Sequence, residues 1–154
     1  MTDNLDNCPN TVANATIDAN GCEVSGGGSY SAVIEAENFD SASEYIVTGT
    51  MNGPVVGANY LNNGTWLTYD PVTIPSSGVY NVSFRVSGYS DNAIRLQDGA
   101  GNDLGTVSFT NSQDWASWIT VTTSMTLTAG SLPLKMIIDG FGPLSVDSIT
   151  IEAQ

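Results

Sequence analysis

The sequence predicts an all-β protein, a β-sandwich jelly roll, and three observations lead to this fold class. Apolar and polar residues alternate along many short segments, which is the period of a strand with one buried face. Stretches rich in glycine, proline, serine and aspartate separate these segments at short intervals. No segment of more than a few residues spaces its apolar side chains at the period of a helix. Short strands joined by glycine-rich turns are typical of sandwiches and jelly rolls.

The clearest predicted strand lies in the segment VYNVSFRVS. There Tyr80, Val82, Phe84 and Val86 alternate with polar residues such as Arg85, so one face of the strand is apolar. The same alternation predicts strands at residues 32–38, 92–98, 118–127, 132–138 and 146–152. The turn signals PSSG, DGAGND, TAGS and DGFGP stand between them.

The charge of the chain limits its partners. Only three residues, Arg85, Arg95 and Lys135, are basic, against 16 acidic residues, and the net charge is −13. This charge repels nucleic acid, anionic lipid and acidic polysaccharides. No apolar run is long enough for a membrane span, and the residues after Met1 lack the pattern of a signal peptide, so we expect the signal of a secreted protein to lie outside this sequence.

Composition divides the chain into three parts. Residues 1–24 contain both cysteines, residues 25–30 form a glycine- and serine-rich linker, and residues 31–154 carry the predicted strands. Cys8 and Cys22 are close in sequence, and we expect a disulfide between them. Closing this loop would stabilise the fold by roughly 3 kcal/mol and would imply an oxidising compartment. The alternative is two free thiols on a disordered tail.

Three carboxylates form a candidate metal site. In the segment AVIEAEN, Glu35 and Glu37 share one face of the predicted first strand, and Asp147 shares a face with Ile149 and Ile151 in the last strand. Chain termini often lie close together, so the first and last strands would bring these carboxylates into one cluster. Oxygen ligands favour calcium over zinc. The alternative is that the glutamates are solvated and Asp147 caps a turn.

An enzyme is not supported by the residues. The sequence contains no histidine, which excludes catalytic triads and histidine-ligated metals. A glycoside hydrolase needs two carboxyl groups across a cleft, about 5 to 10 Å apart. Glu35 and Glu37 point the same way from one strand and leave no room for a sugar between them.

Aromatic residues in polar segments indicate a binding site instead. Tyr60 lies in NYLNNGTWLTYD and Trp115 in the turn of NSQDWASWIT, where Trp118 belongs to the following strand by alternation; Phe141 stands in another turn. Sugar rings present C–H groups on their faces and hydroxyl groups at their edges, so sugar sites combine aromatic rings with amides and hydroxyls. The edge groups would come from Asn59, Asn62, Asn63 and Gln113. The alternative is that one ring folds back over its loop.

Several blocks of the sequence resemble a known family. VIEAENFD, VGANYLNNGTWLTYD, IPSSGVYNVSFRVSG, LGTVSFTNSQDWASWITVTTSMTLTAGSLPLKMII and VDSITIE look like the successive blocks of a family 6 carbohydrate-binding module, over residues 31–154. The resemblance implies a β-sandwich jelly roll, a structural calcium between the first and last strands, and a sugar site in the loops at one end. Members are usually attached to secreted polysaccharide-degrading enzymes.

The resemblance also implies roles for individual residues. Tyr60 and Trp115 would hold a sugar ring between them, and Glu37 and Asp147 would ligate calcium with Glu35 at a neighbouring position. Ser145 stands where many members have an asparagine that hydrogen-bonds the sugar, and Asn59 replaces a glycine and would reach the ligand in its place. Trp66 matches a residue that lines a second cleft in some members, and here we expect it to pack in the core.

The two N-terminal segments DNLDNCPNT and IDANGC resemble the end of a thrombospondin type 3 repeat. Such repeats bind calcium through aspartates, of which Asp3 and Asp6 remain. This combination is similar to marine bacterial enzymes, and GANYLNNGTW is similar to modules attached to agarases. We therefore expect a monomeric, non-catalytic module that targets a linked, secreted enzyme to agarose or another neutral red-algal galactan. The alternatives are xylan or β-glucan as ligand, and a calcium-stabilised adhesion or spacer domain.

Overall fold

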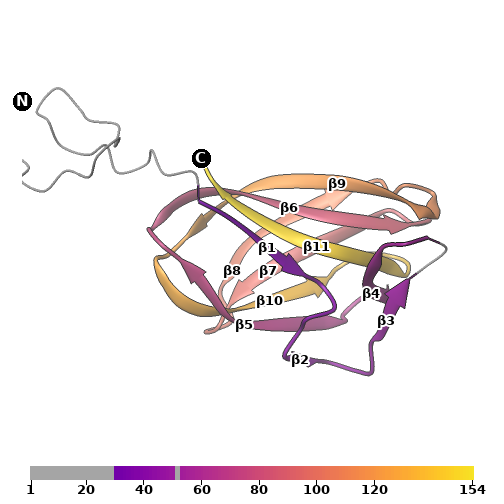
Figure 1. The fold of residues 1–154 in the computed structure, drawn as a ribbon, viewed down its shortest axis with the longest axis horizontal. Coiled ribbons are helices and arrows are strands. Elements are labelled where there is room, and N and C mark those ends of the chain that lie inside the picture. The colour runs from indigo at the N-terminus through magenta and orange to yellow at the C-terminus, as the bar shows by residue number, and fades with distance from the viewer. Residues whose placement is uncertain (1–29, 51–52) are drawn as a thin grey trace, which may run out of the picture.

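The computed structural model describes residues 30–50 and 53–154 of the chain, and these form two antiparallel β-sheets (Figure 1). The strands confirm the predicted all-β sandwich, since none of the described residues is helical. No helix in this part of the chain is long and apolar enough to cross a membrane. The predicted remnant over 1–24, its Cys8–Cys22 disulfide, Asp3 and Asp6 lie outside the described residues.

Eleven strands follow one another along the described residues. Their bounds are β1 (Ser31–Glu35), β2 (Ser41–Ala42), β3 (Val47–Thr50), β4 (Val56–Leu61), β5 (Trp66–Ile74), β6 (Gly78–Gly88), β7 (Asn92–Asp98), β8 (Asp103–Phe109), β9 (Asp114–Leu127), β10 (Gly130–Ile138) and β11 (Leu144–Ala153).

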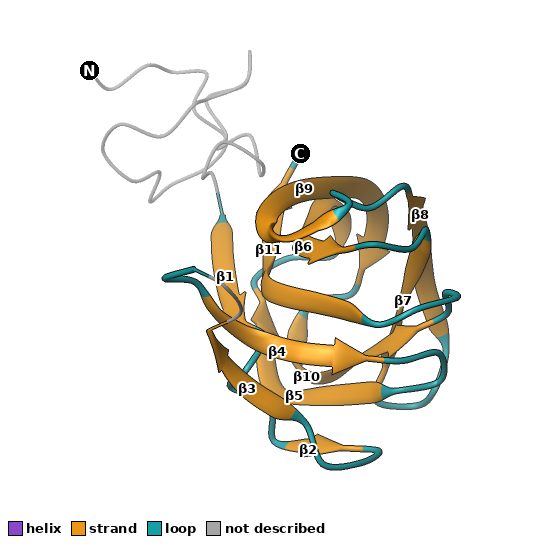
Figure 2. Ribbon diagram, turned by 90° about the vertical axis from the view of Figure 1, so that its right-hand side faces the viewer, coloured by secondary structure: helices purple, strands orange, loops and turns teal. Residues whose placement is uncertain are grey.

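The two sheets face each other (Figure 2). One has the order β3-β4-β11-β6-β9, with β1 also paired to β11, and the other has the order β2-β5-β10-β7-β8. The register of β1 on β11 runs from Ser31 opposite Glu152 to Glu35 opposite Ser148. The first and last strands are therefore neighbours, as the sequence predicts.

The core lies between the sheets and is lined by the inward residues of both. Tyr80, Val82, Phe84 and Val86 are all buried, which confirms the predicted alternation along β6. The prediction that Trp66 packs in the core is wrong. Leu67 and Tyr69 point inward and are buried, so Trp66 lies on the outer face of β5 and is only partly buried.

The connections β4–β5, β6–β7, β8–β9 and β10–β11 all cross between the sheets at one end of the sandwich, which we call the loop end. The described chain enters and leaves at the opposite end. There the amide of Ala153 donates to the carbonyl of Tyr30, and the amide of Gln154 donates to the carbonyl of Val79. Every residue proposed from the sequence for sugar binding lies at the loop end.

Candidate functional site

The site is built on a break in the pairing of β4 with β11. Leu61 lies opposite Leu144 and Ala58 opposite Val146, so two residues, Asn59 and Tyr60, face the single residue Ser145. Such a β-bulge turns side chains away from the regular alternation. Tyr60 has a φ of 59°, which is unusual for a bulky side chain and is typical of strain at functional sites.

A second break lies on the other side of Ser145. On β6, Ser87 pairs with Ser145, and the pairing of β6 with β9 jumps from Val86 opposite Ile119 to Gly88 opposite Asp114. Residues 115–118 therefore leave the regular ladder beside Ser87.

The carboxylate of Asp114 holds this excursion together. It accepts hydrogen bonds from the amide of Ala116 and the hydroxyl of Ser117, both at 2.9 Å. These two bonds hold the pKa of Asp114 below its ordinary value. Trp115 is the second residue of β9 and is partly buried, rather than exposed in a turn as the sequence suggests.

The two breaks place three polar side chains in a row across neighbouring strands: Asn59 on β4, Ser145 on β11 and Ser87 on β6. We call them the polar row. All three are buried, with exposed fractions of 2% for Asn59 and 0% for both serines. The Asn59 Oδ1 and the two serine Oγ atoms have no hydrogen-bond partner within the protein. Buried polar groups are nearly always paired, so these three have unused capacity for a ligand or water.

The side-chain amide of Asn59 is oriented by the backbone. Its Nδ2 donates to the carbonyl oxygens of Gly49 at 2.9 Å and Gly57 at 3.2 Å. Both donor hydrogens are thus used, and the amide oxygen is the group that remains free. A free acceptor beside two free hydroxyls can bind the hydroxyl groups of a sugar.

Three aromatic rings gather beside the polar row. The centroids of Tyr60 and Trp115 are 5.6 Å apart with a tilt of 57°, and Tyr89 meets Trp115 nearly edge to face at 5.8 Å. Centroid distances of about 4.5 to 7 Å are those of aromatic rings in direct contact. Tyr60 and Trp115 therefore touch, and a sugar that stacks on both must first part them.

Sequence reasoning missed Ser87 and Tyr89. Ser87 has the alternation of an outward residue on β6, and only the register shows that it lies beside Ser145. Tyr89 could have been identified from the sequence, because it is a tyrosine among the polar turn residues SGYSDN, just as Tyr60 is a tyrosine among polar residues. The other predicted edge groups are partly used: Asn62 Nδ2 donates to the carbonyl of Tyr60, and Gln113 Nε2 to that of Asn111.

The three predicted calcium ligands lie near β11. Burial, first, and then the negative charges of Asp147 and Glu37 raise the pKa of Glu35. Glu37 has a buried Oε2 with no hydrogen-bond partner. The expected alternation of Asp147 with Ile149 is wrong, because a register shift between Val146 and Ser148 makes Asp147 the extra residue of a bulge.

Arg85 takes part in this carboxylate cluster. Its Nη1 donates to Asp147 Oδ2 at 3.0 Å, and the Asp147 side chain is 13% exposed. Carboxylate oxygens and an unpartnered Glu37 oxygen suit calcium. Within residues 30–50 and 53–154, however, no group of three or more acidic, histidine or cysteine side chains is arranged to hold a metal. A bound ion would need backbone carbonyls or water as further ligands.

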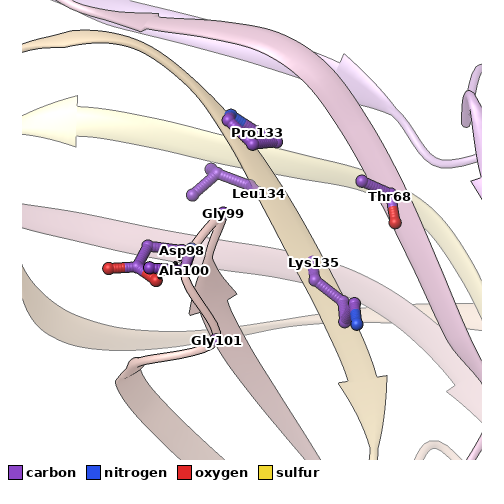
Figure 3. A pocket seen from close by; sticks show the side chains of 8 residues that line it. All are labelled: Thr68, Asp98, Gly99, Ala100, Gly101, Pro133, Leu134 and Lys135. Atoms are coloured by element: carbon purple, nitrogen blue, oxygen red, sulfur yellow. Dashed lines mark hydrogen bonds between the residues drawn. The ribbon is translucent and has the colours of Figure 1, made fainter.

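A separate cleft of about 430 Å³ lies on the other sheet (Figure 3). Thr68, Pro133 and Lys135 line it from β5 and β10, and the turn of residues 98–101 closes it. Lys135 Nζ lies 4.7 Å from the centroid of the Trp66 ring, so the ammonium group covers one face of that ring. None of the residues proposed from the sequence for sugar binding lines this cleft.

The comparisons with known proteins agree with this architecture. The family model described as carbohydrate binding module (family 6) matches residues 35–153. The chain belongs to the family 6 carbohydrate-binding modules. Modules of this family bind sugars and are not catalytic, so the polar row and its aromatic rings lie in a non-catalytic, carbohydrate-binding module.

A relative and two solved structures illustrate the family. This module is 32% identical over 119 residues to an alpha-agarase of Alteromonas agarilytica, a match that covers 70% of this chain and 8% of the agarase. It resembles the C-terminal family 6 module of LamC, a marine laminarinase from Zobellia galactanivorans, with a TM-score of 0.73 and 25% identity, over 81% of this chain and 100% of that one. It also resembles a module of Cellvibrio mixtus lichenase 5A in complex with cellotriose, with a TM-score of 0.71 and 28% identity, over 80% and 97% of the two chains.

The raised pKa of Glu35 predicts how stability depends on pH. The folded protein disfavours ionisation of Glu35. The protonated side chain therefore contributes fully to stability below the ordinary pKa of glutamate, and this contribution is lost as the pH rises through the raised pKa. With divalent cations removed, Glu35→Gln should therefore melt at a higher temperature than the wild type at pH 7 and at the same temperature near pH 3. Glu152→Gln, which removes one charge at the opposite end of β11, is the control. A Glu35→Gln variant that melts below the wild type at pH 7 would contradict the prediction.

Proposed function

We propose that this module binds a neutral polysaccharide at the loop end and so holds a linked, secreted polysaccharide-degrading enzyme on its substrate. The observation that carries the proposal is the polar row with its three unpartnered groups, lying beside the rings of Tyr60 and Trp115. Hydroxyl and amide groups next to aromatic faces are the complement of a sugar ring. The module contributes by raising the local concentration of substrate for the attached enzyme.

Binding would begin with the separation of Tyr60 from Trp115. A sugar between the rings would replace their mutual contact with two stacking contacts, and its hydroxyl groups would then bind Ser145, Ser87 and Asn59 Oδ1 in the adjacent polar row. Each of these groups then gains the hydrogen bond that it lacks in the free protein.

The charge at the site favours a neutral sugar. All three basic side chains of the sequence are engaged elsewhere: Arg85 with Asp147, Arg95 with Asp103 and Asp139, and Lys135 with Trp66. Arg85 shares the outer face of β6 with Ser87, but Asp147 already neutralises it, so the described residues offer no uncompensated cation near the polar row for a carboxylate or sulfate on the sugar. Agarose meets this requirement.

For the ligand we favour agarose or a related neutral red-algal galactan. The similarity to the alpha-agarase supports this choice. Ser145 and Asn59 would form hydrogen bonds with the hydroxyl groups of galactose. The likeness to modules of a laminarinase and a lichenase makes β-glucan the second candidate.

Substitutions in the ring pair should separate binding from stability. Tyr60→Ala and Trp115→Ala should each weaken binding by about 2 to 4 kcal/mol, as expected for central aromatic anchors. Isothermal titration calorimetry in calcium with agaro-, xylo- and cello-oligosaccharides of matched length measures this and identifies the ligand. Tyr45→Ala is the matched control, because Tyr45 is a tyrosine that is 91% exposed and lies before β3.

The melting temperature of Tyr60→Ala should be close to that of the wild type, since the ring is half exposed. A large fall in the melting temperature of Trp115→Ala would show that this ring serves the fold. If the wild type binds none of the three series, the carbohydrate proposal fails and an adhesion or spacer domain becomes the better explanation.

The unpartnered hydroxyl of Ser145 gives a second test. Ser145→Ala removes a buried hydroxyl group without a partner, so the free energy of unfolding should not fall and should rise by up to about 1 to 3 kcal/mol. Affinity for the sugar should fall up to about tenfold, because a ligand hydrogen bond is lost. Ser83→Ala is the opposite control: its hydroxyl pairs with Thr122 at 2.8 Å, so it should affect stability and leave affinity unchanged. Unchanged affinity in Ser145→Ala would remove this residue from the site.

We also propose that calcium stabilises the module at Glu35, Glu37 and Asp147. The support is the mutual repulsion of these carboxylates and the unpartnered, buried Glu37 oxygen, both of which a cation would relieve. Calcium should raise the melting temperature and a chelator should lower it again. Asp147→Ala should abolish this response, whereas Glu152→Ala should keep it. If a chelator leaves the melting temperature of the calcium-treated wild type unchanged, the proposed metal site is wrong.

A further inference from the structure

We propose that Phe141, together with Tyr89, forms a second aromatic subsite that holds a further sugar residue of the same polysaccharide chain. This inference rests on the proposed function and extends it from one sugar ring to a segment of the chain. It comes from four features of the loop between β10 and β11: its exposure, its shape, its anchoring and its position.

Phe141 is 99% exposed, so no other side chain covers either face of its ring. A large apolar ring that is fully in water gains nothing for the fold. It is therefore available to stack against a ligand, as a sugar face requires.

The shape of the loop leaves Phe141 as its projecting group. Glycine precedes and follows it; Gly140 lies tight against the first residue of β7, and Gly142 lies tight against the turn between β6 and β7. A Cβ atom on Gly140 would lie 1.8 Å from Asn92 Oδ1, and one on Gly142 would lie 2.3 Å from Ser90 Oγ. Larger residues would not fit at either position without moving their neighbours, so this close packing depends on the two glycines.

The loop is anchored at both ends. Asp139 accepts a hydrogen bond from Arg95 Nε at 2.6 Å, and its amide donates to the carbonyl of Ala93 at 2.9 Å. Asn92 Nδ2 donates to the carbonyl of Gly142 at 3.0 Å. Phe141 is thus presented by a loop that is fixed on both sides, and a fixed ring loses little freedom when it binds a ligand.

The position of the loop joins Phe141 to the polar row. From the strand order of the two sheets, the connections at the loop end follow one another as residues 62–65, 139–143, 89–91 and 110–113. Phe141 lies between the β4–β5 loop and the turn that bears Tyr89. Tyr89 in turn contacts Trp115 and is 54% exposed. The aromatic cluster of Tyr60, Trp115 and Tyr89 therefore reaches the turn that is adjacent to the loop of Phe141.

The distribution of exposed rings supports a ligand that extends along this end. Among the described residues, the exposed aromatic side chains are Tyr45, Tyr60, Tyr89 and Phe141; Tyr45 lies apart, before β3, and the other three lie on or beside adjacent connections of the loop end. Association of two copies through these rings is disfavoured, because each chain carries a net charge of −13. A neutral polysaccharide has no such repulsion and presents a sugar face at every residue.

The test compares oligosaccharides of two and six sugar residues, drawn from whichever of the agaro-, xylo- and cello- series the wild type binds in calorimetry. Phe141→Ala should weaken binding of the hexasaccharide by roughly tenfold and leave the disaccharide unchanged, because only the longer ligand reaches the second subsite. Phe141→Trp should retain the preference for length, and Tyr45→Ala, on the far side of the β4–β5 loop from Phe141, should not alter it. Melting temperatures of these variants should match the wild type.

The outcomes separate this inference from the proposed function. If the wild type binds but Phe141→Ala has equal affinity for the hexasaccharide, the second subsite is wrong while the sugar site at Tyr60 and Trp115 stands. An equal loss in Phe141→Ala and Tyr45→Ala would also overturn it, because the effect would not be local to this loop. If the wild type binds no oligosaccharide, both proposals fall.

Discussion

The hydrogen bonding of β11 to three strands at once is the constraint on which both candidate sites depend. Its second half lies between β1 and β6, and its first residues lie between β4 and β6. Each change of neighbour falls close to a break in register, one at Ser145 and one at Asp147. The first break positions the polar row and the second positions the carboxylate cluster. Moving β11 by one residue would dismantle both.

The polar row is a local conflict within an otherwise consistent fold. Unpartnered buried polar groups cost about 1 to 3 kcal/mol each, and Tyr60 adopts a backbone conformation that tyrosine avoids. A well-packed sandwich tolerates this cost because Val86, Val146 and Leu144 beneath the row are completely buried. Such conflicts tend to persist where they serve a ligand rather than the fold.

Much of the fold could be predicted from the sequence, because the alternation of apolar residues depends only on which face of a strand is buried. This logic identified β6, β7, β10 and most of β11. It failed at Asp147, because a bulge adds one residue to the strand and interrupts the alternation at that point. It also failed at Trp66, because a large ring reads as apolar even when it lies on an outer face and packs against the ammonium group of Lys135.

The site was partly accessible in the same way. Tyr60 and Trp115 stood out as aromatic rings in polar surroundings, Asn59 as one of the polar groups beside them, and the family resemblance added Ser145. Ser87 could not be found, because its role depends on pairing between β6 and β11 and on the excursion of β9, both of which are long-range features. The contact between the two rings was equally hidden, since sequence spacing carries no information on the distance between side chains 55 residues apart.

The two ends of β11 place the polar row and the described chain termini at opposite ends of the sandwich. The polar row lies where the strand begins, and the described chain enters and leaves where this ten-residue strand ends. At about 3.3 Å per residue this is a separation of roughly 30 Å. A domain joined at either described end would therefore stand off from the captured sugars by several sugar lengths. Under the proposed function, an attached enzyme would act on a neighbouring stretch of the polysaccharide and leave the sugar residues that anchor the module uncut.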